Sequence, residues 1–202
     1  MKKIIVSIVL LMSMLLWTTN AFAASTVTYK VVSGDCMWKI AVKYEVGVSE
    51  IINANPQVQN PNLIYPGQIL NIPTIANNVL AFEQRVVDLT NQKRAENGLS
   101  PLTVNWELSR VARYKSQDMH DNKYFSHTSP IYGSPFTMMT NFGIKYRTAG
   151  ENIAMGQTTP EAVVNAWWNS PGHKANMLNA SFTQIGVGYV QDGNYWTQMF
   201  IG

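Results

Sequence analysis

Residues 185–201 read IGVGYVQDGNYWTQMFI, and this stretch predicts a β-hairpin. Ile185, Val187 and Tyr189 alternate with other residues, as in a strand that buries one face. An Asp-Gly pair at residues 192–193 predicts the turn, and residues 195–201 return as a largely apolar strand. Helical patterns lie earlier in the chain and few β-α-β patterns occur. The sequence therefore predicts an α+β fold and argues against a doubly wound sheet.

Three helical patterns precede this hairpin. The first begins near Val79, has apolar residues at three- and four-residue spacing, and is expected to end at Gly98. The second begins near Asn105. The third begins with Thr-Pro-Glu at residues 159–161, where a capping hydroxyl precedes a proline and an acid in the first turn. This third helix is expected to end at the Pro-Gly pair of residues 171–172.

Residues 27–73 carry a smaller pattern of strand, helix, helix and strand. Alternating apolar residues predict the first strand, and Asp35 is expected to cap the helix that follows it. A second short helix opens at residues 48–49, and a Pro-Gly turn at residues 66–67 leads into the returning strand. Residues 74–78 are short and uncharged. We interpret them as a linker to a second domain over residues 79–202.

The first residues have the layout of a secretory signal peptide. Lys2 and Lys3 precede an apolar run over residues 4–17, and the small residues Ala21 and Ala23 follow at the cleavage positions. A membrane anchor is the alternative, but the run is shorter than the ~20 residues of a spanning helix. We therefore predict that residues 1–23 are a signal peptide, and that the mature chain is secreted without a transmembrane anchor.

The charge of the mature chain argues against a nucleic-acid partner. Loss of Lys2 and Lys3 reduces the 15 basic residues to 13 against 12 acidic ones, so the net charge falls from +3 to +1. No basic cluster interleaved with aromatic residues occurs, although binding to polyanions depends on such clustering. Nucleic acid is therefore not an expected partner.

Cys36 is the only cysteine, so the chain cannot form an internal disulfide. The stability of the fold must then come from its core. The thiol is expected to serve in packing, with a cross-link to another chain as the alternative.

Three motifs occur in order within residues 27–73. They are YKVVSGDCMW at residues 29–38, INANP at residues 52–56 and NLIYPGQ at residues 62–68. Together they resemble the LysM module, with Cys36 standing where that family usually has a small hydroxyl residue. The resemblance implies a βααβ module that binds N-acetylglucosamine glycans, such as peptidoglycan or chitin, between two loops. Carried over, the first loop contributes Gly34, Asp35, Cys36 and Met37, and the second contributes Asn62, Leu63, Ile64 and Tyr65.

Several of these residues also have structural explanations. Asp35 is expected to act first as a helix cap, and a turn favours Gly, Asn and Asp without any ligand. Trp38 and Tyr44 follow a helical spacing, so we expect them in the core of the module and not on a glycan platform.

A second set of motifs lies in residues 79–202. These are YFSHT at residues 124–128, GENIA at 150–154, SPGH at 170–173 and IGVG at 185–188. In this order they resemble the CAP superfamily of cysteine-rich secretory, antigen 5 and pathogenesis-related proteins, and above all its disulfide-free bacterial branch. The resemblance implies a three-layer α-β-α sandwich with a central cavity.

In many CAP proteins two histidines and two glutamates line that cavity and can hold a divalent metal. His127, His173 and Glu151 match three of these positions, whereas Asn169 and Ser170 stand where the second glutamate is expected. Two imidazoles, one carboxylate and a water can hold Zn²⁺, and the same groups can act as acid and base in hydrolysis. Alternatively, Glu151 is structural and accepts backbone hydrogen bonds.

Two functions follow from these resemblances. The first is a binding protein of the cell wall or spore envelope, which binds peptidoglycan through LysM and a ligand, envelope protein or spore-coat protein through CAP. The second is a metal-dependent hydrolase acting on peptidoglycan or protein. We favour the non-enzymatic reading with no required cofactor, because CAP domains lack a shared demonstrated reaction and the metal set is incomplete. The order of the two modules resembles envelope or spore-coat proteins of endospore-forming Gram-positive bacteria.

Overall fold

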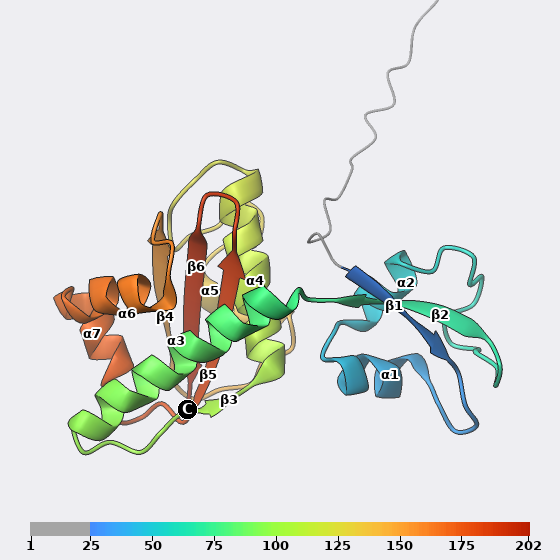
Figure 1. Cartoon of the computed structure of the whole chain (residues 1–202), viewed down its shortest axis with the longest axis horizontal. Helices are drawn as coiled ribbons and strands as arrows, with labels where there is room; N and C mark the ends of the chain where they lie inside the picture. The colour runs from blue at the N-terminus through green and yellow to red at the C-terminus, as the bar shows by residue number, and fades with distance from the viewer. Residues whose placement is uncertain (1–24) are drawn as a thin grey trace, which may run out of the picture.

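The computed structural model describes residues 25–202, which form two folded units in succession (Figure 1). The predicted signal peptide over residues 1–23 lies outside the described residues. Within residues 25–202, none of the helices combines the length and the apolar character that crossing a bilayer requires.

The first unit is the predicted βααβ module. It consists of β1 (Ser25–Lys30), α1 (Met37–Tyr44), α2 (Val48–Asn53) and β2 (Ile69–Thr74). The two strands pair antiparallel along their whole length, with Ser25 opposite Thr74. Apolar residues of both helices, of β2 and of the connecting segments form a compact buried cluster: Val31, Met37, Ile40, Ala41, Val46, Ile51, Leu70 and Ile72.

Asn55 joins the end of α2 to β2. Its side-chain amide donates to the carbonyl oxygens of Ile51, at 2.7 Å, and of Asn71, at 2.6 Å. The side-chain oxygen Oδ1 of Asn55 accepts from the backbone N–H of Asn71 at 2.8 Å. Because Asn55 is only 1% exposed, these bonds are shielded from water and fix the base of the following loop.

Asp35 does not cap α1, so this part of the sequence prediction was wrong. The N-cap position belongs to Cys36, which makes no side-chain capping bond. The carboxylate of Asp35 turns back instead and accepts from the backbone N–H of Val32, at 2.9 Å, and from the hydroxyl of Tyr29, at 2.7 Å. The bond from Val32 and then that from Tyr29 lower the pKa of Asp35. Asp35 therefore stabilises the turn after β1.

The second unit is a three-layer α-β-α sandwich, as predicted (Figure 1). Its strands are β3 (Thr103–Val104), β4 (Ala149–Met155), β5 (Gln184–Val190) and β6 (Tyr195–Ile201), in the order β3-β5-β6-β4. Only the pairing of β3 with β5 is parallel. One face of the sheet is covered by α4 (Trp106–Asp121) and α5 (Pro135–Asn141). The other is covered by α3 (Asn77–Glu96), α6 (Pro160–Trp168) and α7 (Pro171–Met177).

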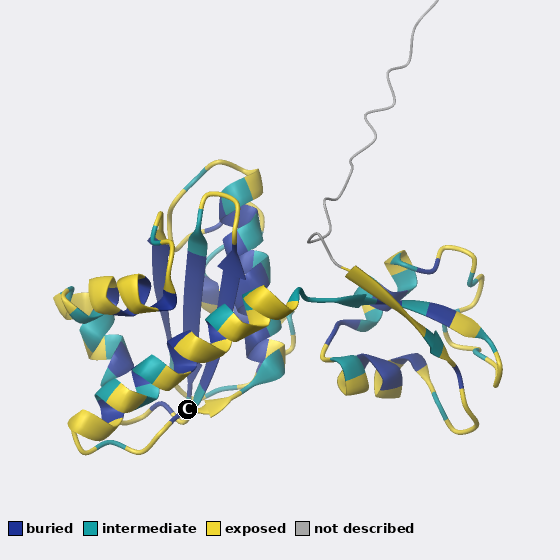
Figure 2. Cartoon of the chain, in the orientation of Figure 1, coloured by how far each residue is buried: buried dark blue, intermediate teal, exposed yellow. Residues whose placement is uncertain are grey.

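The sheet is buried on both faces, as the dark strands in Figure 2 show. Along β6, Trp196 and Phe200 contribute to the core beneath α3 and α6, while Met199 and Ile201 contribute to the core beneath α4 and α5. A strand that packs against apolar helical layers on both faces of the sheet has no solvent-exposed face. This explains why residues 195–201 read as an apolar run in the sequence.

Helix α4 lies directly on β5 because two glycines face it. A Cβ at Gly186 would lie 2.4 Å from the backbone of Leu108 and Ser109, and one at Gly188 would lie 2.2 Å from the backbone of Ala112 and Arg113. No side chain fits at either position. The IGVG motif is therefore a packing requirement of this contact.

The predicted helix starts at Asn105 and Thr159 are confirmed. The side chain of Asn105 accepts from the N–H of Leu108, and that of Thr159 accepts from the N–H of Ala162. The predicted end of the third helix was wrong. Helix α6 ends at Trp168, and Pro171 opens the separate helix α7 in its first turn, where a missing N–H costs nothing.

Arg94 ties α3 to the segment between α7 and β5. Its guanidinium donates to the carbonyl oxygens of Ser100, Met177, Asn179 and Phe182, at 2.9, 2.9, 3.0 and 3.3 Å. The residue is only 1% exposed. The carbonyls of Met177 and Phe182 depend most on Arg94, because their bonds to it are buried and water cannot replace the guanidinium there.

We predict that Arg94→Met lowers the free energy of unfolding by about 3 kcal/mol, because it leaves several buried carbonyls without a donor. Urea denaturation at neutral pH measures this change. Arg85→Met on the same helix is the control: Arg85 pairs with Glu161 on the surface, their side chains being 51% and 56% exposed, and its loss should cost less than about 0.5 kcal/mol. Equal losses in the two variants would contradict this role for Arg94.

Candidate functional site

His127 and Glu151 form a hydrogen-bonded pair at the edge of the sandwich. Their Nδ1 and Oε1 atoms lie 2.7 Å apart. The side chain of Glu151 is 1% exposed and that of His127 is 52% exposed, so a buried carboxylate orients an accessible imidazole. The second oxygen of Glu151, Oε2, is buried without a hydrogen-bond partner.

Glu151 owes its position to β4, a strand that the sequence analysis did not predict. The strand pairs with β6 and is buried over residues 150–154, so its sequence lacks the alternation of a half-buried strand. Asn152 donates to the carbonyl of His173, at 3.1 Å, and Asn176 on α7 donates to that of Glu151, at 3.1 Å. These amides connect β4 to the helix that carries His173.

Lys115 positions the loop of His127. Its ammonium group donates to the carbonyl oxygens of Ser126, at 2.7 Å, and His127, at 2.9 Å, and to the hydroxyl of Tyr124, at 3.1 Å. Lys115 is fully buried, and burial lowers its pKa. The sequence analysis missed this residue, because a lysine within an amphipathic helix is ordinarily a surface residue.

The surroundings of Glu151 and His173 shift the pKa values of both residues. Burial raises the pKa of Glu151, and the hydrogen bond from His127 and the charge of Lys115 oppose that rise. His173 is close enough to interact electrostatically with His127: burial first, and then the charge of His127, lower the pKa of His173. The structure therefore brings His127 and Glu151 into contact, with His173 as a neighbour.

These residues do not fit a zinc site as they are arranged. Across residues 25–202, no group of three His, Cys, Asp or Glu side chains is placed to hold a metal ion. Oε1 of Glu151 bonds to Nδ1 of His127 and Oε2 is buried, so Glu151 presents no accessible oxygen to an ion, and Asn169 and Ser170 offer no carboxylate where the family has its second glutamate. We therefore derive no chemical step through a metal.

The predicted glycan residues lie on two loops of the LysM module. Leu63 and Tyr65 are 52% and 60% exposed, and Gly34 and Asn62 are exposed as well. Cys36 is also exposed, so the expectation that its thiol serves in packing was wrong. Asp35 is half-buried by its bonds to the turn. Met37 is 5% exposed and Ile64 packs against the core, so the side chain of Met37 is not accessible to a sugar.

Trp38 lies outside the core, contrary to the sequence prediction. It is 66% exposed, because the buried face of the short helix α1 is taken by Met37, Ile40 and Ala41. Tyr44 packs against the core as predicted, with its ring 5.7 Å from that of Tyr29. The helical spacing of Trp38 and Tyr44 in the sequence did not show which side chain faces the core and which faces solvent.

Comparison with known families agrees with both resemblances. The family model described as "Cysteine-rich secretory protein family" (CAP) matches residues 87–200. The model of the LysM domain, a peptidoglycan-binding module, matches residues 29–73. The uncharacterized protein YkwD of Bacillus subtilis (strain 168) is 62% identical over 124 residues, which cover 61% of this chain and 48% of that protein. The uncharacterized membrane protein YlbC of the same strain is 40% identical over 119 residues, covering 59% of this chain and 34% of that protein.

A solved structure is also similar. An extracellular protein containing a SCP domain from Bacillus anthracis str. Ames shares 34% identity with a TM-score of 0.59, covering 67% of this chain and 47% of that one. The chain thus spans about half the length, or less, of these three proteins. Taken with the three-layer sandwich and its His127–Glu151 pair, the family match over residues 87–200 means that the chain belongs to the CAP family, with a LysM domain preceding its CAP domain.

Proposed function

We propose that this chain is a non-enzymatic binding protein of the cell wall, which holds peptidoglycan through its LysM loops and presents its CAP domain there. The observation that carries the proposal is the exposure of Leu63 and Tyr65, at 52% and 60%, on a loop of a LysM domain. Apolar side chains of this kind cover the faces of sugar rings, while the amide of Asn62 and backbone groups suit acetamide groups.

The two loops are held together at their base, which reduces the entropy lost on binding. The N–H of Gly67 donates to the carbonyl of Val31 at 2.8 Å, and the N–H of Val31 donates to that of Gln68 at 2.9 Å. The side chain of Gln68 also accepts from the N–H of Tyr65 at 3.0 Å. The apolar side chains are therefore displayed by a braced loop.

The proposal includes a location and partners. After removal of residues 1–23, the protein is secreted and retained at the cell wall or spore envelope of a Gram-positive bacterium. The glycan that it binds is peptidoglycan, or a chitin-like polymer, which offers the same N-acetylglucosamine units. The CAP domain then binds a ligand, an envelope protein or a spore-coat protein.

We predict that the double variant Leu63→Ser, Tyr65→Ser weakens binding to purified peptidoglycan about tenfold, because two apolar contacts with sugar rings are lost. Sedimentation of the mature chain with insoluble peptidoglycan measures the affinity. The matched control is Phe125→Ser, Ile131→Ser, which removes apolar residues of the CAP domain that are 48% and 61% exposed. Unchanged sedimentation of the Leu63→Ser, Tyr65→Ser variant would contradict the proposal.

A second candidate function is acid–base hydrolysis of peptidoglycan or protein, and the His127–Glu151 pair favours it. A buried carboxylate bonded to Nδ1 directs the other ring nitrogen of His127 to accept a proton from water. The chain lacks the second glutamate of the family's set of two histidines and two glutamates. The binding role does not require acid–base chemistry at His127. We keep binding as the proposed function.

Incubation of the mature chain with peptidoglycan, with and without zinc, separates the two functions. We expect no new amines or reducing ends, with the protein recovered in the pellet, because the proposed role is binding without cleavage of the glycan or its peptides. Release by the wild type that disappears in both His127→Asn and Glu151→Gln would instead identify a hydrolase. Protein heated before incubation is the control for contaminating activity.

Glu151 also makes stability depend on pH. Its pKa is raised above the ordinary 4.5, so the folded chain binds the proton more tightly than the unfolded chain. The stabilisation is therefore complete below about pH 4.5 and is lost as the pH rises through the folded-state value. We predict that the wild type loses more unfolding free energy than Glu151→Gln between about pH 4.5 and 7. Urea denaturation across this range measures it, and parallel curves would contradict the assignment.

A further inference from the structure

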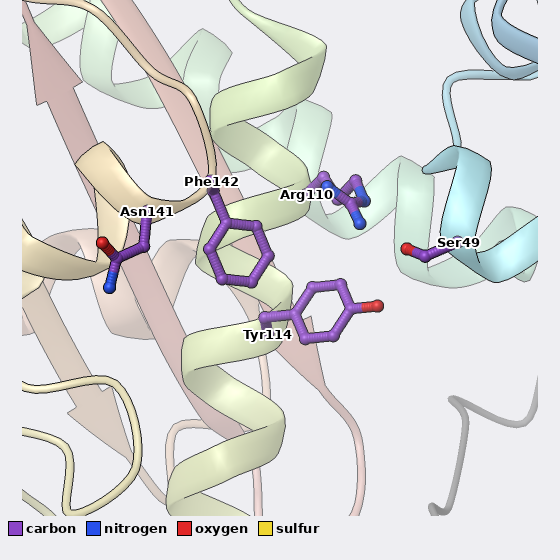
Figure 3. A pocket seen from close by; sticks show the side chains of 5 residues that line it. All are labelled: Ser49, Arg110, Tyr114, Asn141 and Phe142. Atoms are coloured by element: carbon purple, nitrogen blue, oxygen red, sulfur yellow. The ribbon is translucent and has the colours of Figure 1, made fainter.

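Two hollows lie where the LysM module meets the CAP domain, and they share Arg110 and Phe142. The larger, of about 410 Å³, lies between α2, which carries Ser49, and Arg110 and Tyr114 of α4 (Figure 3). The smaller, of about 130 Å³, is lined by Trp38 and Val42 of α1 and by Trp106, Glu107 and Phe142 of the CAP domain. We call the two together the junction groove.

Glu50 holds the two walls of the junction groove in place. One carboxylate oxygen accepts from Arg110 Nε at 2.6 Å and from the hydroxyl of Tyr114 at 2.7 Å. The other oxygen accepts from the backbone N–H of Gly47 at 2.5 Å. The guanidinium of Arg110 passes so close to Gly47 that a Cβ there would lie 2.3 Å from Nη2. The contact therefore brings α2 and α4 together at this point.

The lining of the junction groove has the chemistry of a sugar site. Trp38 leaves 66% of its surface exposed, so its indole is available to contact the face of a sugar ring. Trp106 and Phe142 add aromatic surface from the opposite wall, and Glu107 and Asn141 offer groups that bond to hydroxyls and acetamides. Flat apolar surfaces beside a few polar groups suit pyranose rings, which have apolar faces and polar edges.

The wall of the groove begins next to the first glycan loop in the sequence. Trp38 follows Cys36 and Met37 directly in the chain, so the first glycan loop leads onto the wall of the groove. Val42 lies one helical turn after Trp38 and therefore on the same face of α1. Trp38 and Val42 share the smaller hollow with Trp106, so this face of α1 lies opposite the CAP domain.

The geometry points to the junction groove as a second glycan subsite, occupied by the N-acetylglucosamine strand that the LysM loops hold. This inference rests on the proposed function, because the same strand must first bind the loops. Its consequence is that the CAP domain contributes to glycan affinity and that the full chain prefers long strands to short ones.

Calorimetry of the mature full chain with the tetramer and the octamer of N-acetylglucosamine tests the inference. We expect the octamer to bind more tightly, and Trp106→Ala to weaken octamer binding about tenfold while leaving tetramer binding unchanged. Trp168→Ala is the matched control, because Trp168 lies on α6 beside Lys93 and Lys174, outside the groove, and should change neither affinity.

Glu50→Gln provides a second variant that leaves the aromatic lining intact. It keeps an acceptor for Gly47 but loses the charge that pairs with Arg110, so octamer affinity should fall while tetramer affinity is kept. Tetramer binding with no gain for the octamer, or full octamer affinity in Trp106→Ala, would overturn the second subsite alone. Absence of tetramer binding by the wild type would overturn the proposed function together with it.

Discussion

The close contact between α4 and β5 determines the positions of the His127–Glu151 pair and of the junction groove. Gly186 and Gly188 allow the helix backbone to lie where any Cβ would clash, at 2.4 and 2.2 Å. From this one helix, Lys115 reaches the loop of His127 and Arg110 reaches Glu50 of the LysM module. A third basic residue, Arg113, pairs with buried Glu83 at 2.6 Å and connects the helix to α3. Displacement of α4 would therefore disturb the His127–Glu151 pair and the junction groove together.

Local signals in the sequence were sufficient for much of the fold. The caps at Asn105 and Thr159 act within one helical turn, and the C-terminal hairpin depends on a turn pair, so neighbouring residues determine them. β4 was missed because a strand buried on both faces has no alternating pattern. The burial of Arg94 and Lys115 was equally inaccessible, since their partners are carbonyl oxygens of loops that only the folded chain brings near.

The candidate site was predicted in part. The motifs around His127 and Glu151 led to a pair that the structure brings to 2.7 Å, but the same motifs implied a metal set that residues 25–202 do not form. The exposure of Trp38 depends on which face of α1 turns inward, and helical spacing alone does not decide it. The junction groove requires the relative position of two units, which no motif within either one encodes.

The connection between the two units is very short: β2 ends at Thr74 and α3 begins at Asn77. A connection of two residues is much shorter than a flexible tether, and the Glu50–Arg110 pair adds a further contact between the units. Under the proposed function, the CAP domain would stay within a short distance of the glycan that the LysM module binds. Molecules that pass close to that glycan would then be the ones that meet His127.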